Sequence, residues 1–292
     1  MILIVKSCLS HIICLVACLW CLLPTQASAQ APVADSTKML LTDLNVQIEA
    51  TQAVNDMYNF KFKSAEQQFR WLKQKYGWHP LPYFLHGLST WWKIAPDVAV
   101  ETYDNAFIAY MDTSIYLANR LFEADKQNVE AAFFLAAAYA FKGRLYSERG
   151  RWRKAASVSK SALKYLNVSK GNETFSPELL FGDALYNYYV VWAAENYPML
   201  KPVLLFFPKG DKEKGLEQLV EVSNNAFYTR TEAQYFLMRI MASDQKNIPE
   251  ALRLAEYLHT TFPDNPYFHR YYARMLYNSG RFTKARKLSE QI

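Results

Sequence analysis

The sequence is poor in glycine, and it has no cysteine beyond residue 29. Nine glycines in 292 residues is about 3%, well under the ~7% average, which leaves little material for phosphate-binding loops or tight hairpins. Nucleotide enzymes and all-β folds are therefore disfavoured. All four cysteines (Cys8, Cys14, Cys18 and Cys21) precede residue 30, so the remainder of the chain can form neither a disulfide nor a thiolate metal site.

The common catalytic motifs are also missing. The sequence contains no Gly-x4-Gly-Lys-Ser/Thr loop, no His-Glu-x2-His zinc motif and no Gly-x-Ser-x-Gly nucleophile turn. The histidines after residue 29 are His79, His86, His259 and His269. His79 and His86 could meet across a turn, but a metal needs three or four converging ligands. We therefore expect no catalysis, no metal and no cofactor.

The charge balance is mildly basic, with 33 Lys and Arg against 27 Asp and Glu. Nucleic-acid binders normally concentrate a stronger positive charge on one face, so no nucleic-acid partner is expected. The segment 141–170 is nevertheless locally basic, because Glu148 is its only acid. Its cations are Lys142, Arg144, Arg149, Arg151, Arg153, Lys154, Lys160, Lys164 and Lys170. Such a segment can attract an acidic peptide, a carboxylate terminus or an anionic lipid, or it can be a solvated outer face.

The first 29 residues differ in kind from the rest. Lys6 is the only charged residue there, an apolar run extends from Cys8 to Leu23, and Ala27-Ser28-Ala29 follows Pro24. This pattern is typical of a secretory signal peptide, cut before Gln30, that exports the protein to the periplasm or cell envelope.

Two alternatives to cleavage stay open. The apolar run could be an uncleaved anchor, although it is short of the ~20 residues of a membrane span. Leu15-Val16-Ala17-Cys18 resembles a lipobox, so a lipid anchor through Cys18 is the other alternative. Residues 30–38 are expected to form a flexible start of the mature chain.

Beyond residue 38, apolar side chains recur at helical spacing almost throughout. One example is the series Ala131, Phe134, Leu135, Ala138, Tyr139 and Phe141, and runs of β-branched alternation are absent. Segments such as Trp78-His79-Pro80 and Phe262-Pro263-Asp264-Asn265-Pro266 interrupt the pattern, because proline cannot continue a helix. The sequence predicts an all-α fold divided into helical hairpins.

A repeated motif links the middle of the chain to its end. Gly280-x-Phe282-x2-Ala285 matches Gly150-x-Trp152-x2-Ala155, and a third copy reads Ala251-x3-Ala255-x2-Leu258. Ala251 precedes Ala285 by 34 residues, the period of tetratricopeptide repeats. The chain therefore resembles the tetratricopeptide-repeat (TPR) family over residues 39–292, most strongly at 139–166 and 251–285. The segment 181–219 is similar to a block in exported bacterial proteins of that family. The resemblance implies a right-handed solenoid of helical hairpins whose concave groove binds a protein or peptide.

The last hairpin offers a candidate partner-binding surface. Tyr267, Arg270, Arg274 and Tyr277 share one helical stripe, and in this family the first helix of each hairpin lines the groove. Arg270 and Arg274, like Arg144 of the basic segment, suit an acidic partner because arginine pairs bidentately with carboxylates. A terminal hairpin can equally be a polar cap.

A second candidate surface is the aromatic segment 186–207. It contains Tyr188, Tyr189 and Trp192 and continues into a proline-bounded apolar stretch. Such a segment could grip an extended ligand, stack on sugars or enter a membrane interface, or it could simply fill the core.

Two functional hypotheses follow. The first is an exported TPR scaffold that binds another protein or peptide in the cell envelope without catalysis. The second is a glycan- or solute-binding module that uses the aromatic segment 186–207. Peripheral membrane association stays open in either case.

Overall fold

The computed structural model describes residues 38–291 apart from 170, 173–174, 199–200 and 206. The predicted signal peptide, with its alternatives, lies outside the described residues, as do residues 30–37 of the expected flexible segment. Residues 38–292 form one compact unit by their internal contacts.

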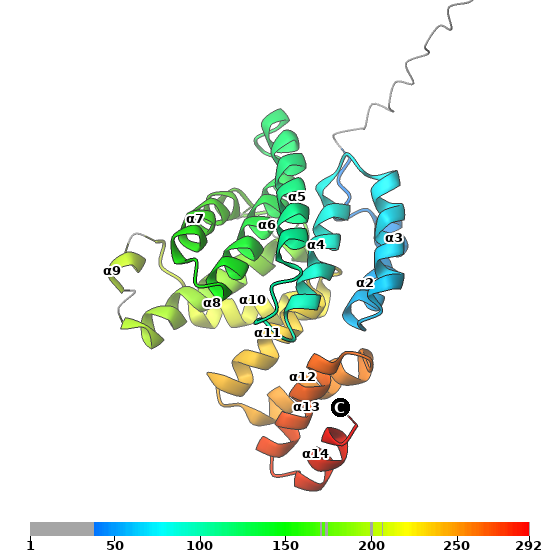
Figure 1. The fold of residues 1–292 in the computed structure, drawn as a ribbon. Helices are drawn as coiled ribbons and strands as arrows, with labels where there is room; N and C mark the ends of the chain where they lie inside the picture. The colour runs from blue at the N-terminus through cyan, green and yellow to red at the C-terminus, as the bar shows by residue number, and fades with distance from the viewer. Residues whose placement is uncertain (1–37, 170, 173–174, 199–200, 206, 292) are drawn as a thin grey trace, which may run out of the picture. The chain divides into compact units, whose positions relative to one another are not determined.

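The described residues are predominantly helical and contain no β-strand, which confirms the all-α prediction (Figure 1). The helices are α2 (Leu44–Tyr58), α3 (Phe62–Lys75), α4 (Pro80–Ile94), α5 (Asp104–Ala124), α6 (Val129–Glu148), α7 (Trp152–Ser169), η1 (Pro177–Leu179), α8 (Leu180–Asn196), α9 (Lys201–Leu204), α10 (Lys212–Asn225), α11 (Arg230–Ser243), α12 (Ile248–Thr261), α13 (Pro266–Asn278) and α14 (Phe282–Ser289). They pack chiefly as successive pairs: α2 with α3, α4 with α5, α6 with α7, α8 with α10, α11 with α12, and α13 with α14.

The two glycine-containing motifs form the same helix end. Gly150 follows α6 with φ of 65° and Gly280 follows α13 with φ of 76°, a region that favours glycine. The residue after each glycine donates its N–H five positions back, from Arg151 to the Tyr146 carbonyl at 2.8 Å and from Arg281 to the Leu276 carbonyl at 2.9 Å. This is the Schellman pattern, and it explains why a glycine stands at both turns.

Contacts also join helices that are distant in the sequence. The Trp92 ring of α4 packs against Tyr58 of α2, Tyr235 of α11 and Phe268 of α13, with ring centroids 5.5, 5.6 and 5.3 Å away. Asn265, the N-cap of α13, donates its side-chain amide to the Tyr58 carbonyl at 2.7 Å. In an ideal linear repeat array each unit contacts only its neighbours, and these contacts are additional to the pairing of successive helices.

A buried carboxylate fixes the start of α11. Glu178 of η1 accepts the backbone N–H groups of Phe227, Tyr228 and Thr229 at 2.6, 2.8 and 2.9 Å, and the Thr229 hydroxyl at 2.6 Å. A carboxylate is favourable there because the first N–H groups of a helix lack intrahelical partners. This contact sets the position of Thr229 and Glu232 at the cavity described next.

Candidate functional site

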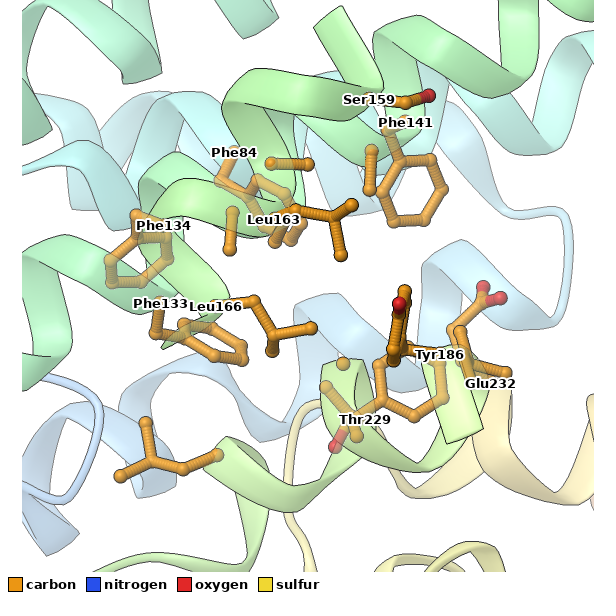
Figure 2. Close-up of a pocket in the computed structure, with 18 of the residues that line it drawn as sticks. Phe84, Phe133, Phe134, Phe141, Ser159, Leu163, Leu166, Tyr186, Thr229 and Glu232 are labelled. Atoms are coloured by element: carbon orange, nitrogen blue, oxygen red, sulfur yellow. The ribbon is translucent and has the colours of Figure 1, made fainter. Parts of the chain in front are cut away.

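An apolar cavity of about 450 Å³ lies between α4, α6, α7, α8 and the start of α11 in the described part of the chain. Figure 2 shows its wall as almost entirely carbon, with Phe84, Phe133, Phe134, Phe141, Leu163 and Leu166 among the labelled side chains. Oxygen atoms come from few side chains, namely Ser159, Tyr186, Tyr189, Thr229, Glu232 and the buried Tyr228. The cavity is thus suited to an apolar ligand with few hydrogen-bonding groups.

The cavity follows from a break in helix pairing. Each second helix of a pair packs on the next pair at α3–α4, α5–α6, α10–α11 and α12–α13, but α7 and α8 make no comparable contact. The chain between them runs irregularly through the described residues 171–172 and 175–176 into η1. The space that a direct α7–α8 contact would fill is therefore left between the helices.

The aromatic segment supplies one wall of the cavity. Tyr186, Tyr189 and Val190 of α8 line it, and so do Leu204 and Phe207 further along the chain. Burial raises the pKa of the Tyr189 phenol to about 12, so this hydroxyl is neutral at physiological pH. The alternative hypothesis assigns a ligand to the segment 186–207, and part of this segment lines the apolar cavity.

The other two aromatic candidates do not line this cavity. Tyr188 is fully buried and donates a hydrogen bond to Asp244, so its ring is not offered to an external partner. Trp192 is half-buried and packs edge-on against Tyr189 and Tyr197. Tyr188 is therefore a packing residue. Trp192 contacts Tyr189, which lines the cavity, but does not line the cavity itself.

One end of the cavity carries a buried carboxyl group. Glu232 is 2% exposed, and its Oε1 accepts the Trp92 indole N–H at 2.7 Å and the Tyr58 hydroxyl at 3.5 Å. Its Oε2 is buried and has no hydrogen-bond partner within the described chain. Burial raises the pKa of Glu232, against the lowering influence of the Arg144 charge and of the two hydrogen bonds.

Arg144 is part of the same buried arrangement. Its guanidinium lies 4.4 Å from the centroid of the Trp91 ring and 5.4 Å from that of Phe236, and its Nη2 donates to the Tyr235 hydroxyl at 3.4 Å. The sequence predicts Arg144 to be part of a partner-binding surface. In the structure the side chain is half-buried and stacked on aromatic rings, so it is not part of an open basic face.

The other cations of the basic segment separate into two groups. Arg149 forms two hydrogen bonds with Asp104, both 2.7 Å long, and donates to the Val98 carbonyl, while Lys142 pairs with Asp112. Both are held by α5 or the loop before it. Arg151, Arg153, Lys154, Lys160 and Lys164 lie on or next to α7 and are exposed; Lys170 lies outside the described residues.

The terminal hairpin brings three of its four predicted residues together, whereas Tyr267 packs against Trp92 and Tyr235. Arg270, Arg274 and Tyr277 of α13 line one open groove of about 580 Å³, with Phe282 and Arg286 of α14 on its other side. Tyr277 packs on Phe282 with centroids 5.3 Å apart. Arg270 also donates to the Pro96 carbonyl at 3.3 Å, and Arg286 lies 3.8 Å from Glu290.

The four histidines among the described residues all pack against other side chains. His79 is buried, accepts the Leu81 N–H at 3.2 Å through Nδ1, and faces Glu130 through Nε2 at 3.2 Å. His259 and His269 stack with centroids 4.6 Å apart. Within the described residues no three His, Cys, Asp or Glu side chains gather as a group that could hold a metal ion.

Sequence reasoning did not identify Glu232, Glu178 or Glu130. Glu232 falls in the first turn of a helix, where an acid is ordinarily explained by the helix dipole. Its partners Trp92 and Tyr58 are 140 and 174 residues away, so no local pattern marks it as buried.

No helix of the described part of the chain is both long and apolar enough to cross a membrane. Comparisons with protein-family models, with curated proteins and with solved structures find no match to this chain.

Proposed function

We propose that this chain is an exported binding protein of the TPR type that holds an elongated amphiphile in its interior cavity and acts without catalysis. The observation that carries the proposal is the size of the apolar cavity. Pockets of ~300–1,000 Å³ hold drug-sized ligands, and the space of about 450 Å³ falls in this range.

The chemistry of the wall favours an apolar occupant. Water is held poorly there, because each buried water needs two to four polar partners and the wall offers few. An apolar ligand covers this surface without that requirement, and covering apolar surface contributes about 25 cal/mol per Å².

The position of Glu232 narrows the ligand class. The apolar wall suits a hydrocarbon chain, whereas the unpartnered Oε2 requires a hydrogen-bonding group at that end. A hydroxyl satisfies a carboxyl group in either protonation state, because a hydroxyl both donates and accepts. We therefore assign a neutral, long-chain alcohol or a related hydroxylated amphiphile to the site.

The test uses the uncharged apolar fluorophore N-phenyl-1-naphthylamine, added to protein from which copurified lipid has been extracted. Binding should enhance its fluorescence, and 1-dodecanol should displace it. Ala162→Phe, which projects a ring from α7 into the cavity, should abolish the enhancement and leave the melting temperature unchanged or higher, because a void is filled.

Ala156→Phe is the matched control, because Ala156 lies on the exposed side of the same helix. It should bind the fluorophore as the wild type does. Absence of enhancement with the delipidated wild-type protein, or equal enhancement with Ala162→Phe, would rule the cavity out as the binding site.

The groove of the terminal hairpin favours a second candidate function, the protein-binding scaffold. It gathers Arg270, Arg274 and Arg286 beside Tyr277, and planar guanidinium groups pair well with carboxylates. The supporting feature is the convergence of these side chains from two helices. The partner would be an acidic peptide or a carboxylate terminus.

This second function is tested with a fluorescent oligoglutamate peptide. Arg270→Glu combined with Arg274→Glu should weaken binding by ~1–3 kcal/mol, and high salt should mimic the variant. Lys160→Glu with Lys164→Glu makes the same change in net charge on α7 and serves as the control. Equal affinity of the groove variant and the wild type at low ionic strength would place the partner elsewhere.

A further inference from the structure

Helix α7 has two opposite faces with different roles. Ser159, Ala162 and Leu166 line the cavity, whereas Arg153, Lys160 and Lys164 are exposed. The spacing of these three cations, i, i+7 and i+11, places them on one stripe turned away from the cavity. The proposed ligand cavity therefore lies on one side of α7, and the basic face lies on the other side of the same helix.

The outward charge of α7 is mostly uncompensated within the described chain. The helix has no acidic residue, and its exposed cations form no ion pair within the described residues, in contrast to the paired Lys142 and Arg149. Lys164 is the partial exception, because its charge contributes to the lowered pKa of Glu123. Trp152 at its first position is 67% exposed, but it lies roughly 100° around the helix from the stripe of cations. A row of exposed basic residues is typical of the polar face of helices that lie at a membrane interface.

A second element links the same cavity to the surface. Leu204 and Phe207 line the cavity, while Leu205 between them is 84% exposed. The chain thus passes from the cavity wall to solvent within one residue and presents an apolar side chain there. An exposed leucine near a basic helix can enter the boundary between headgroups and acyl chains.

We propose that the exposed face of α7, together with Leu205, docks on an anionic phospholipid bilayer, from which the cavity takes its ligand. The docking surface stands on the charge of α7 and the exposure of Leu205, whereas the ligand transfer rests on the proposed function of the cavity. The cations attract the headgroups, and the cavity behind α7 and Leu204 is the apolar space nearest to that surface. An acidic protein would not explain why the apolar Leu205 is exposed beside the cavity wall.

The test is flotation of the purified protein with vesicles of phosphatidylcholine, alone or mixed with phosphatidylglycerol. The protein should float with the mixed vesicles at low ionic strength, and salt should release it. Each basic residue near an anionic surface contributes ~5-fold in partitioning, so Lys160→Glu with Lys164→Glu should reduce vesicle binding by at least ~25-fold. Lys284→Glu with Lys287→Glu makes the same charge change on the exposed face of α14 and should reduce it far less.

Two further variants keep the outcome interpretable. Lys160→Gln with Lys164→Gln avoids repulsion within the helix and should still weaken binding, and Leu205→Ser should weaken it without any change in charge. Circular dichroism checks that each variant is folded. Failure of the wild type to float with anionic vesicles, or equal losses in the α7 and α14 variants, would overturn the docking surface.

The fluorophore assay separates this proposal from the proposed function. If the α7 variants lose vesicle binding but still bind N-phenyl-1-naphthylamine in solution, the docking surface is supported and the cavity is intact. If Ala162→Phe loses the fluorophore but floats with anionic vesicles as the wild type does, docking is shown to be independent of the cavity. If the wild type floats but takes up no dodecanol from vesicles loaded with it, the transfer step is wrong.

Discussion

At the scale of single residues, buried ionisable groups determine how this protein should respond to pH. Glu232 and His86 are both almost fully buried, and burial disfavours the charged form of each. For an acid this raises the pKa, and for a histidine it lowers the pKa. The two residues therefore make the unfolding free energy depend on pH with opposite signs. Single substitutions can separate the two contributions.

Glu232→Gln should remove the pH dependence of the unfolding free energy that Glu232 causes. Because the folded pKa of Glu232 is raised, the folded state binds more protons than the unfolded state above the ordinary glutamate pKa of ~4.3. The unfolding free energy of the wild type should therefore fall as the pH rises through this region. The amide is neutral and still accepts from Trp92, so the variant should lose that slope.

Glu232→Leu is the contrasting variant. It leaves the Trp92 N–H without its acceptor and should destabilise the protein by ~1–3 kcal/mol. Urea unfolding at several pH values measures both effects. An unchanged slope in Glu232→Gln would show that the carboxyl group ionises in the folded protein as it does in the unfolded chain.

His86 should make the protein sensitive to acid. The ring stacks on Tyr110 with centroids 4.9 Å apart and meets Phe69 edge-on, and burial lowers its pKa to about 4. The unfolded chain takes up a proton near pH ~6.5, so stability present above that pH should be lost as the pH falls towards 4. The full effect is on the order of 3 kcal/mol. His86→Gln should reduce this loss in urea titrations between neutral and acidic pH, and an equal loss in the variant would assign it to other groups.

At the scale of helices, the sequence predicts where helices start and end, because local chemistry controls these positions. Gly150 and Gly280 are identifiable because a left-handed helix end needs glycine, and Asn265-Pro266 marks a helix start because asparagine caps and proline fits the first turn. The first stretch of strong repeat resemblance ends at residue 166, just before the irregular stretch between α7 and α8. The consequence of this irregular stretch, an open cavity, depends on how far apart two helices come to lie, and no local pattern encodes that distance.

Replacing Ala155 or Ala285 with leucine tests the shared hairpin motif. Both alanines are buried, with 9% and 6% exposure, and each lies in the first turn of the second helix of its pair. A leucine overpacks such a contact and should cost ~1–3 kcal/mol, seen as a lower melting temperature. Ala156→Leu on the exposed side of α7 is the control. Unchanged melting of both buried variants would remove the close-packing explanation for the motif.

At the scale of the whole molecule, the contacts between early and late helices were beyond sequence reasoning. The resemblance to a repeat family implies a linear array, whereas Trp92 joins α4 to α2, α11 and α13. Tryptophan, tyrosine and phenylalanine on helical stripes are compatible with either arrangement, because their spacing marks a buried face without naming its partner. The aromatic content was visible in the sequence, but the pairing of distant helices was not.

These long-range contacts should make the two ends of the chain unfold together. Asn265 caps α13 through the N–H groups of Tyr267 and Phe268 and also donates to the Tyr58 carbonyl at 2.7 Å. Asn247 caps α12 through Glu250 and has no such contact with α2. Asn265→Ala and Asn247→Ala therefore remove the same kind of cap, each at a cost of ~0.5–2 kcal/mol, and differ in the contact with α2.

Amide hydrogen exchange distinguishes the two variants. Asn265→Ala should lower protection at the end of α2, around Met57 and Tyr58, as well as in α13, because the Tyr58 carbonyl loses its buried donor. Asn247→Ala should lower it mainly around α12. In a linear array both variants would act only on the terminal hairpins, since coupling there passes between neighbours alone. Protection of α2 that is the same in both variants would mean that the Tyr58–Asn265 contact does not couple the ends of the chain.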